Sequence, residues 1–221
     1  MEYKNLNGGK ASDKIAVYNC DCMDLLKQTP DNYYELSIVD PPYGIGDKFK
    51  GGKSGKMNFN EVVEKGWDNE TPSNKYFNEL KRVSKNQIIW GGNYFLDNLG
   101  NTRCFICWDK KISEDFTLAM AELAWTSFDE LAKIFRMSVP KTGGKIHPTQ
   151  KPVKLYEWIL HHYAKKGDKI LDTHRGSASL DIACHNLGFD LVTCEIDTDY
   201  FKDGNKRLKQ HQNQQVINFE L

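Results

Sequence analysis

Short apolar runs alternate with segments of helical periodicity along this chain. The apolar runs, many of them ended by Gly, Pro or an acidic residue, predict strands at 15–18, 36–39, 87–90, 103–108, 131–137, 169–172 and 190–195. Apolar positions at helical spacing predict helices at 24–28, 76–84, 93–99, 116–125, 153–165, 180–187 and 200–211. Strands that alternate with helices are typical of a mostly parallel sheet with helices on both faces, so the pattern predicts an α/β fold.

Composition limits the classes of protein to which the chain can belong. It has 221 residues, 30 Lys and Arg against 30 Asp and Glu, and 39% hydrophobic residues, which fits one globular domain over 1–221. This balance argues against a disordered or collagen-like chain, and against binding of nucleic acid by a global positive field. The chain has no run of about 18 apolar residues, and positions 1–14 are polar. We therefore expect a cytoplasmic protein that has no membrane partner.

Two sequence features suggest ligand sites that their spacing does not support. Cys104 and Cys107 form a lone C-x-x-C pair in a predicted strand, where residues three apart face opposite ways, so we expect reduced thiols and no structural metal. The segment 50–57 is similar to a phosphate-binding loop, but Lys50 stands where that loop requires Gly and Met57 where it requires Ser or Thr. We interpret 44–69 instead as one long basic loop, and loops of this length are usually functional or disordered.

Candidate chemistry gathers where the predicted strands end, which is where open α/β sheets bind ligands. Strand 169–172 ends in Asp172 and a turn of small residues, and the next strand ends in Glu195. That is the arrangement of a nucleotide-binding βαβ unit, in which the acid accepts hydrogen bonds from ribose hydroxyls. Strand 36–39 ends in Asp40-Pro-Pro-Tyr43, whose prolines fix a rigid extended turn. A flat heterocycle stacked on Tyr43 could have its exocyclic amine held by Asp40 and the carbonyl of Pro41.

Four segments together resemble the DNA amino-methyltransferases that modify adenine N6 or cytosine N4. Asp40-Pro-Pro-Tyr43 is similar to their catalytic tetrapeptide, and 147–152 to the motif that precedes the helix beside the methionine pocket. Positions 172–179 are similar to their glycine-rich cofactor loop, and 19–23 to the segment near the cofactor adenine. The catalytic motif comes first, as in the β class. The resemblance spans about 15–208 and implies a doubly wound, mostly parallel, seven-stranded methyltransferase sheet (class I, Rossmann-like) with circularly permuted motif order.

The resemblance also implies a cofactor and a set of site residues. The catalytic residues that hold the target base would be Asp40, Pro41, Pro42 and Tyr43. S-Adenosyl-L-methionine would be bound by Asp21, Asp40, Thr149, Gln150, Lys151, Asp172, Thr173, Gly176, Ser177 and Glu195. Within that set, Asp21 would lie near the adenine amine, Glu195 at the ribose and Asp172 at the methionine end.

The implied activity is methyl transfer from S-adenosylmethionine to a base in DNA, in the setting of restriction–modification. The target atom cannot be reached inside a duplex, so the base must be flipped out. Asp at the first position of the tetrapeptide favours adenine N6, and cytosine N4 stays open as an alternative.

Three positions depart from the family's cofactor loop. Thr173 and His174 replace Pro and Phe, and Ala178 replaces the second Gly, where an added Cβ could crowd the cofactor. These departures keep open a second hypothesis, a catalytically impaired DNA-binding or partner subunit with the same fold. A nicotinamide-dependent oxidoreductase is a third hypothesis, but it lacks the glycine fingerprint and leaves Asp40-Pro-Pro-Tyr43 unexplained.

Binding of DNA by this chain would need local positive charge, because the net charge is zero. Lysines in the two loops 44–69 and 138–146 are expected at the mouth of the site and in contact with DNA: Lys48, Lys50, Lys53, Lys56, Lys141 and Lys145. The catalytic core takes up almost the whole chain, so no separate target-recognition domain is expected. Recognition of the DNA sequence would then come from these loops or from a second subunit, or would be short and lax. A homodimer is compatible with the sequence.

Overall fold

The computed structural model describes residues 3–46, 66, 68–115, 119–138, 146–147 and 149–214. These residues form one nine-stranded sheet in the order β1-β2-β9-β8-β3-β4-β6-β5-β7. The strands are β1 Asn7–Lys10, β2 Ile15–Asn19, β3 Tyr34–Val39, β4 Ser84–Trp90, β5 Phe105–Asp109, β6 Ala121–Thr126, β7 Lys133–Arg136, β8 Lys169–Asp172 and β9 Asp190–Glu195. Neighbours from β2 to β4 are parallel, whereas β1 and β6 pair antiparallel to the strands beside them.

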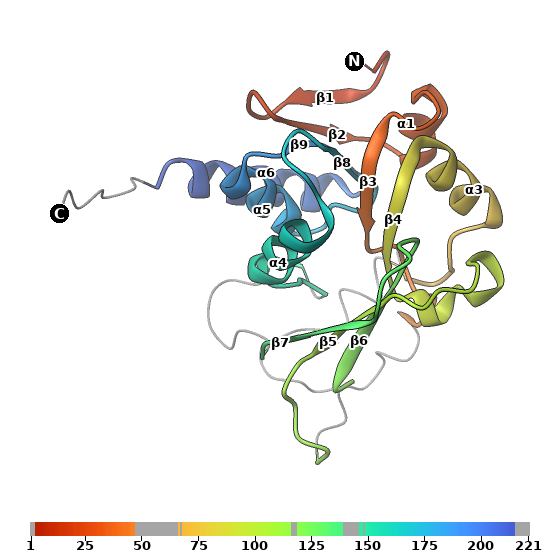
Figure 1. Ribbon diagram of the computed structural model, residues 1–221. Helices are drawn as coiled ribbons and strands as arrows, with labels where there is room; N and C mark the ends of the chain where they lie inside the picture. The colour runs from red at the N-terminus through yellow and green to blue at the C-terminus, as the bar shows by residue number, and fades with distance from the viewer. Residues whose placement is uncertain are drawn as a thin grey trace.

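Helices cover both faces of this sheet (Figure 1). They are α1 Cys22–Gln28, α3 Asn74–Val83, α4 Val153–Tyr163, α5 Ser179–Leu187 and α6 Thr198–Gln212. Successive residues of each strand point to opposite faces of the sheet, so their side chains contribute alternately to two hydrophobic cores, one on each face. Ile38 and Ile88 belong to the core beneath α4, α5 and α6, and their neighbours Val39 and Ile89 belong to the core beneath α1 and α3. The α/β class and the doubly wound arrangement expected from the sequence are confirmed.

The sheet has two more strands than expected. The edge strand β1 contains two glycines and no large apolar side chain, so it gives no apolar signal in the sequence. The helix predicted over 116–125 is wrong: within the described part of that range the chain forms β6, which lies between β4 and β5. Tertiary pairing outweighs the local helical spacing there.

The helix predicted over 93–99 is also wrong. Two single turns of 3-10 helix, Gly92–Tyr94 and Leu96–Asn98, occupy this stretch instead. Asn93 lies inside the first of these turns. Over the described residues, none of the helices is long and apolar enough to cross a membrane.

Candidate active site

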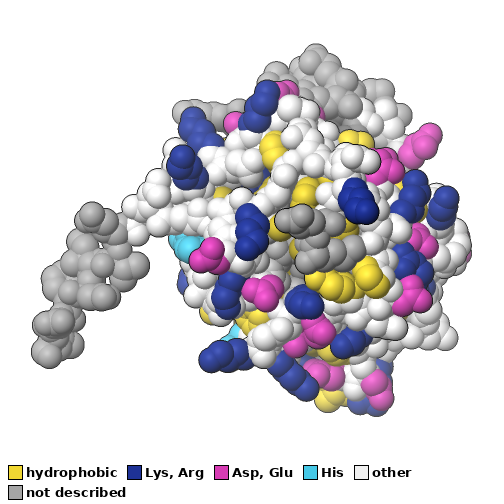
Figure 2. Space-filling model, turned by 90° about the horizontal axis from the view of Figure 1, so that it is seen from above, with side chains coloured by type: hydrophobic (Ala, Val, Ile, Leu, Met, Phe, Trp, Pro, Cys, Tyr) yellow, Lys and Arg dark blue, Asp and Glu magenta, His cyan; other side chains and the backbone are white. Residues whose placement is uncertain are grey.

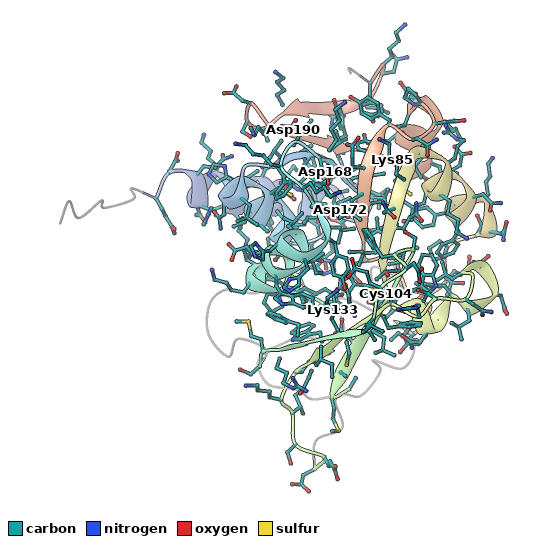
Figure 3. The ribbon with its side chains drawn as sticks, in the orientation of Figure 1. Lys85, Cys104, Lys133, Asp168, Asp172 and Asp190 are labelled. Atoms are coloured by element: carbon teal, nitrogen blue, oxygen red, sulfur yellow. The ribbon has the colours of Figure 1, made fainter. Side chains whose placement is uncertain are left out.

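The carboxyl ends of the central parallel strands meet at one edge of the sheet. Strands β3 and β8 are paired, with Leu36 opposite Ile170, and β8 is paired with β9. Asp40 therefore follows β3 at the edge where β8 ends in Asp172 and β9 ends in Glu195. Asp168 and Asp172, labelled in Figure 3, lie at the two ends of β8, and Asp172 lies at the site edge.

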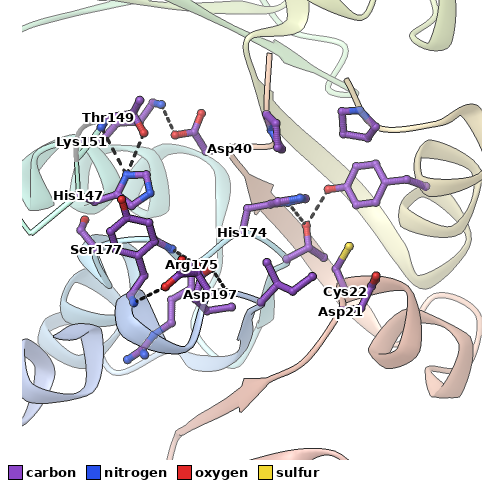
Figure 4. A pocket seen from close by; sticks show the side chains of 18 of the residues that line it. Asp21, Cys22, Asp40, His147, Thr149, Lys151, His174, Arg175, Ser177 and Asp197 are labelled. Atoms are coloured by element: carbon purple, nitrogen blue, oxygen red, sulfur yellow. Dashed lines mark hydrogen bonds and ion pairs between the residues drawn. The ribbon is translucent and has the colours of Figure 1, made fainter. Parts of the chain in front are cut away.

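A cavity of about 440 Å³ opens at this edge. Its lining includes ten of the site residues predicted from the sequence: Asp21, Asp40, Pro42, Thr149, Gln150, Lys151, Thr173, Gly176, Ser177 and Glu195. Pro41, Tyr43 and Asp172 are not part of the lining. The predicted DNA-contacting lysines Lys48, Lys50, Lys53, Lys56, Lys141 and Lys145 lie outside the described residues. Figure 4 shows the cavity with residues from the start of α1, from the loop before α4 and from the loop after β8.

Glu195 fixes the loop that follows β8. Its Oε2 accepts a hydrogen bond from the Gly176 backbone N–H at 2.8 Å, and its Oε1 accepts one from Asp197 N–H at 2.9 Å. Burial raises the pKa of Glu195, although both N–H donors act in the opposite direction. The Glu195 carboxylate therefore ties the ends of β8 and β9 together at the wall of the cavity.

Asp172 lies behind the same loop and orders its first turn. Its Oδ1 accepts a hydrogen bond from the His174 backbone N–H at 2.9 Å. Burial raises the pKa of Asp172 well above its usual value, and the nearby Asp181 acts in the same direction. Asp172 is thus a support for the loop in this structure and not a wall of the cavity.

The two unusual residues of the loop, Thr173 and His174, form a polar cluster with α3. Thr173 Oγ1 lies 2.7 Å from the hydroxyl of Tyr76 and 2.9 Å from His174 Nδ1. Burial lowers the pKa of His174 to about 4, so its imidazole is neutral near pH 7. All three side chains line the cavity, and Tyr76 is a site residue that the sequence did not reveal.

Ala178 adopts the left-handed conformation, with φ of 60°, at the start of α5. Its Cβ does not face the cavity. It lies on the side of α6, where a Cβ added at Gly204 would come within 3.4 Å of it. The absence of a side chain at Gly204 makes room chiefly for the Arg175 guanidinium, because an added Cβ would lie 3.0 Å from Arg175 Nη1, whereas its 3.4 Å distance to the Ala178 methyl group is an ordinary contact. The expected crowding of a cofactor by this methyl group does not arise from this arrangement.

A buried ion pair anchors the loop from behind. Arg175 Nε and Nη2 both lie 2.8 Å from Oδ2 of Asp181, and both side chains are fully buried. On the other side, Nη1 of Arg207 donates a hydrogen bond to the Ser177 carbonyl at 2.6 Å. These contacts connect the loop after β8 to α5 and α6.

The predicted catalytic tetrapeptide has a defined internal geometry. The Tyr43 hydroxyl donates a hydrogen bond to Asp40 Oδ1 at 2.6 Å. Burial, reinforced by Asp40, raises the pKa of Tyr43 well above its usual value, so the phenol stays a donor. The Tyr43 ring stacks on Tyr94, with centroids 4.9 Å apart and planes 13° apart. Asp40 and Pro42 line the cavity, whereas the Tyr43 ring is not part of the lining and packs against Tyr94.

Asp68 holds the chain that follows the tetrapeptide. Its Oδ1 accepts hydrogen bonds from the backbone N–H groups of Tyr43, at 2.6 Å, and Gly44, at 3.1 Å. Burial raises the pKa of Asp68, while these N–H donors act to lower it. Asp68 is a supporting residue that sequence reasoning missed, because nothing in its local pattern connects it to residues 25 positions earlier.

Lys151 reaches Asp40 and is surrounded by acidic and aromatic groups. Its Nζ lies 2.5 Å from Asp40 Oδ2 and 3.1 Å from Glu122 Oε2. It also lies 5.0 Å from the centre of the Trp90 ring. The sequence placed Lys151 among cofactor ligands, whereas its closest partner in the structure is the predicted catalytic carboxylate. Glu122 is a further residue that the sequence missed, because its strand was predicted as a helix.

Asp21 lines the far end of the cavity and begins α1. Its Oδ1 accepts a hydrogen bond from the Met23 backbone N–H at 2.7 Å, which is an N-cap interaction. In the described part of the chain, there is no group of three or more His, Cys, Asp or Glu side chains that could hold a metal ion.

Comparison with known proteins shows similarity to DNA methyltransferases. The model of the DNA methylase family that covers adenine-N6 and cytosine-N4 enzymes matches residues 124–206. Type II methyltransferase M.HpaI of Haemophilus parainfluenzae is 24% identical over 83% of this chain and 70% of its own length. Type II methyltransferase M2.MboI of Moraxella bovis is 26% identical over 86% of both chains.

Solved structures share the architecture. The complex of M1.HpyAVI with SAM aligns with a TM-score of 0.59 and 19% identity, over 88% of this chain and 98% of that one. The cytosine-N4-specific PvuII DNA methyltransferase aligns with a TM-score of 0.62 and 13% identity, over 95% of each chain. The fold is thus the class I, Rossmann-like methyltransferase fold. The chain is similar to DNA methyltransferases over most of its length, and the match to the DNA methylase family model covers residues 124–206.

Proposed function

We propose that this protein transfers a methyl group from S-adenosylmethionine to N6 of an adenine flipped out of DNA. The observation that carries the proposal is the position of Asp40 and Pro42 on the wall of a cavity that is also lined by the loop after β8 and by Glu195. One cavity thus offers a carboxylate for a base amine beside a loop suited to a nucleoside cofactor.

The residues around the cavity fit the cofactor by their chemistry. Carboxylates at the ends of β2 and β9, from Asp21 and Glu195, can accept hydrogen bonds from an adenine amine and from ribose hydroxyls. The loop residues Thr173, Gly176 and Ser177, together with Thr149 and Gln150, would enclose the methionine end. Bound S-adenosylmethionine would supply a methyl group on a sulfonium centre and would leave as the neutral thioether S-adenosylhomocysteine, and the methylated amine would release one proton.

Asp40 would act by orienting the target amine. The lone pair of an adenine amine is delocalised into the ring, which makes the nitrogen a poor nucleophile. Hydrogen bonds from its two hydrogens to Asp40 and to the Pro41 carbonyl would favour a pyramidal nitrogen with an available lone pair. Each oxygen of Asp40 already accepts one donor, from Tyr43 or Lys151, and each keeps a second lone pair for the substrate. By the resemblance, Tyr43 would stack on the flipped base, which requires that its ring, stacked on Tyr94 and outside the cavity lining in this structure, becomes accessible to the base.

Analysis of the methylated product tests this proposal. The full-length protein is incubated with radiolabelled S-adenosylmethionine and unmethylated DNA, and the nucleosides are separated after digestion. We expect label in N6-methyladenine. Label in N4-methylcytosine would overturn the assignment of adenine. No transfer to any duplex, by a protein that binds the cofactor saturably in calorimetry, would support the impaired-subunit hypothesis. No saturable binding would overturn the proposed cofactor.

Replacing Asp40 tests the role of its carboxylate. Asp40→Ala, and the isosteric Asp40→Asn, should lower methyl transfer by about a hundredfold or more, because an amine-orienting acceptor is lost. Calorimetric cofactor binding should persist in both variants and serves as the check of folding. Asp13→Ala removes an exposed carboxylate in the turn between β1 and β2, away from the cavity, and should keep wild-type transfer.

A further inference from the structure

Glu122 reaches the active-site edge because of the direction of its strand. Strand β6 is antiparallel to β4, with Trp90 opposite Ala124. The beginning of β6 therefore lies at the edge where the parallel strands end. Glu122 and Ala124 are two residues apart and so share one face of the sheet. That face packs beneath α4, and Lys151 lies just before α4 in the chain.

The charged groups at this place form a continuous chain of ion pairs. Lys110 Nζ lies 2.5 Å from Glu122 Oε1, and the other oxygen of Glu122 lies 3.1 Å from Lys151 Nζ. Lys151 Nζ in turn lies 2.5 Å from Asp40 Oδ2. Two cations thus alternate with two carboxylates, and the four formal charges add to zero.

Lys151 is the central and most buried member of this chain. Its side chain is 1% exposed, compared with 23% for Glu122 and 17% for Asp40. Burial acts to lower the pKa of Lys151, but Asp40 and Glu122 outweigh it, so the pKa is raised. Burial acts to raise the pKa of Glu122, but Lys151 and Lys110 outweigh that effect and lower it. The ammonium therefore stays charged and cannot serve as a base.

A charged lysine bound only to Asp40 would oppose methyl transfer. Positive charge develops on the amine nitrogen as the methyl group arrives, and a neighbouring ammonium repels it. The ammonium would also take up the acceptor capacity that the amine needs. A second carboxylate that shares the lysine reduces both effects.

We propose that Glu122 is a positioning residue for methyl transfer. It holds the Lys151 ammonium between two carboxylates, so that Asp40 keeps both its orientation and its capacity to accept the target amine. Lys110 fixes the other oxygen of Glu122 and thereby its orientation. This inference rests on the proposed methyltransferase activity, and it assigns a role to a residue outside the four sequence motifs.

Glu122→Gln keeps the shape of the side chain and removes its charge. We expect kcat for methyl transfer to fall by about tenfold or more, because electrostatic preorganisation at the reacting amine is lost. The Kd for S-adenosylmethionine and the KM for DNA should stay within about twofold of wild type, since the change affects the chemical step. Glu122→Asp, which keeps the charge on a shorter side chain, should recover part of kcat.

Glu79→Gln is the matched control. Glu79 is 24% exposed, close to Glu122, and forms an ion pair of 2.7 Å with Arg82 on α3, away from the cavity. The Glu79→Gln variant should keep the wild-type kcat. A loss of cofactor binding in Glu122→Gln would mean that Glu122 only supports the fold, and this would overturn the positioning role.

A double-mutant cycle separates the positioning role from a general effect of lost charge. Lys151→Met removes the group through which Glu122 is inferred to act. In that background Glu122→Gln should change kcat by less than about twofold, because the two effects are not additive. An equal loss of kcat in both backgrounds, or wild-type kcat in Glu122→Gln, overturns the inference alone. No methyl transfer by the wild-type protein overturns the proposed function, and the inference with it.

Discussion

Buried acids support the candidate site at the level of single residues. Asp172, Glu195 and Asp68 accept backbone N–H groups from the loops that shape the cavity, and burial raises the pKa of all three. An acid whose pKa is raised in the folded protein favours folding only while it is protonated. The carboxyl groups that order the site therefore reduce stability near neutral pH.

This gives a pH-dependent prediction for Asp172. Its contribution to the free energy of unfolding is fully present below the ordinary carboxyl pKa of about 3.9 and is lost as the pH rises through its raised folded pKa. Asp172→Asn keeps an oxygen for the His174 N–H and cannot ionise. The free energy of unfolding of the variant, measured in urea between pH 4 and pH 8, should rise relative to wild type as pH increases. A difference that is constant over this range would contradict the prediction.

At the scale of elements, the turn after β4 positions the ring of Tyr43. Gly91 has φ of 70°, and a Cβ added there would lie 2.2 Å from the Tyr43 ring. The turn therefore needs glycine both for its backbone and for the close approach of the ring. Immediately beyond it, Tyr94 stacks on Tyr43 and is 44% exposed.

Gly91→Ala should displace the Tyr43 ring. The left-handed backbone alone costs roughly 1–2 kcal/mol with a side chain, and the contact with Tyr43 adds to this. Methyl transfer should fall by about tenfold or more, because a residue proposed to hold the target base is moved away from its position. Calorimetric binding of S-adenosylmethionine should be kept, since Gly91 is not part of the cavity lining. In Gly100→Ala, where an added Cβ meets no atom within 4 Å, both activity and stability should stay close to wild type. Equal activity of the two variants would contradict this prediction.

The elements also show what the sequence could and could not predict. The central strands were predictable because Ile38, Ile170 and Leu191 stand in short apolar runs with sharp ends. Those ends carry Asp40, Asp172 and Glu195, respectively. Strand β6 was not predictable, because its segment contains Ala121, Ala124 and Trp125 at i, i+3 and i+4, a spacing that also suits a helix. Pairing with β4 and β5 decides its conformation, and this pairing depends on residues far away in the chain.

The residues of the candidate site also fall into two groups, those that the sequence could predict and those that it could not. Residues that belong to contiguous motifs were predictable, and most of those described line one cavity. Asp68, Tyr76 and Glu122 come from other segments, and only the fold brings them to the motifs. Their contacts join residues 25, 97 and 29 positions apart, respectively, so no local pattern indicates them.

Charge is the property of the whole molecule that bears on DNA binding. The 30 basic and 30 acidic residues cancel, and Figure 2 shows both signs interspersed on the face that it presents. A neutral protein of this kind would have to bind the phosphate backbone through a local group of cations. The segment 48–56 supplies four lysines and no acidic residue directly after the predicted catalytic motif.

These lysines lead to a prediction about salt dependence. The logarithm of the DNA affinity should fall with the logarithm of salt concentration, with a slope of about −0.9 for each phosphate neutralised. Replacing Lys48, Lys50, Lys53 and Lys56 by Gln should reduce that slope by up to about 0.9 per lysine in contact with DNA. The control replaces Lys10, Lys85, Lys165 and Lys166, which are exposed near the opposite ends of the parallel strands, and should keep the wild-type slope. Fluorescence anisotropy with a labelled duplex between 50 and 300 mM salt measures both slopes. Equal slopes for the two variants would mean that DNA contacts lie elsewhere on the molecule.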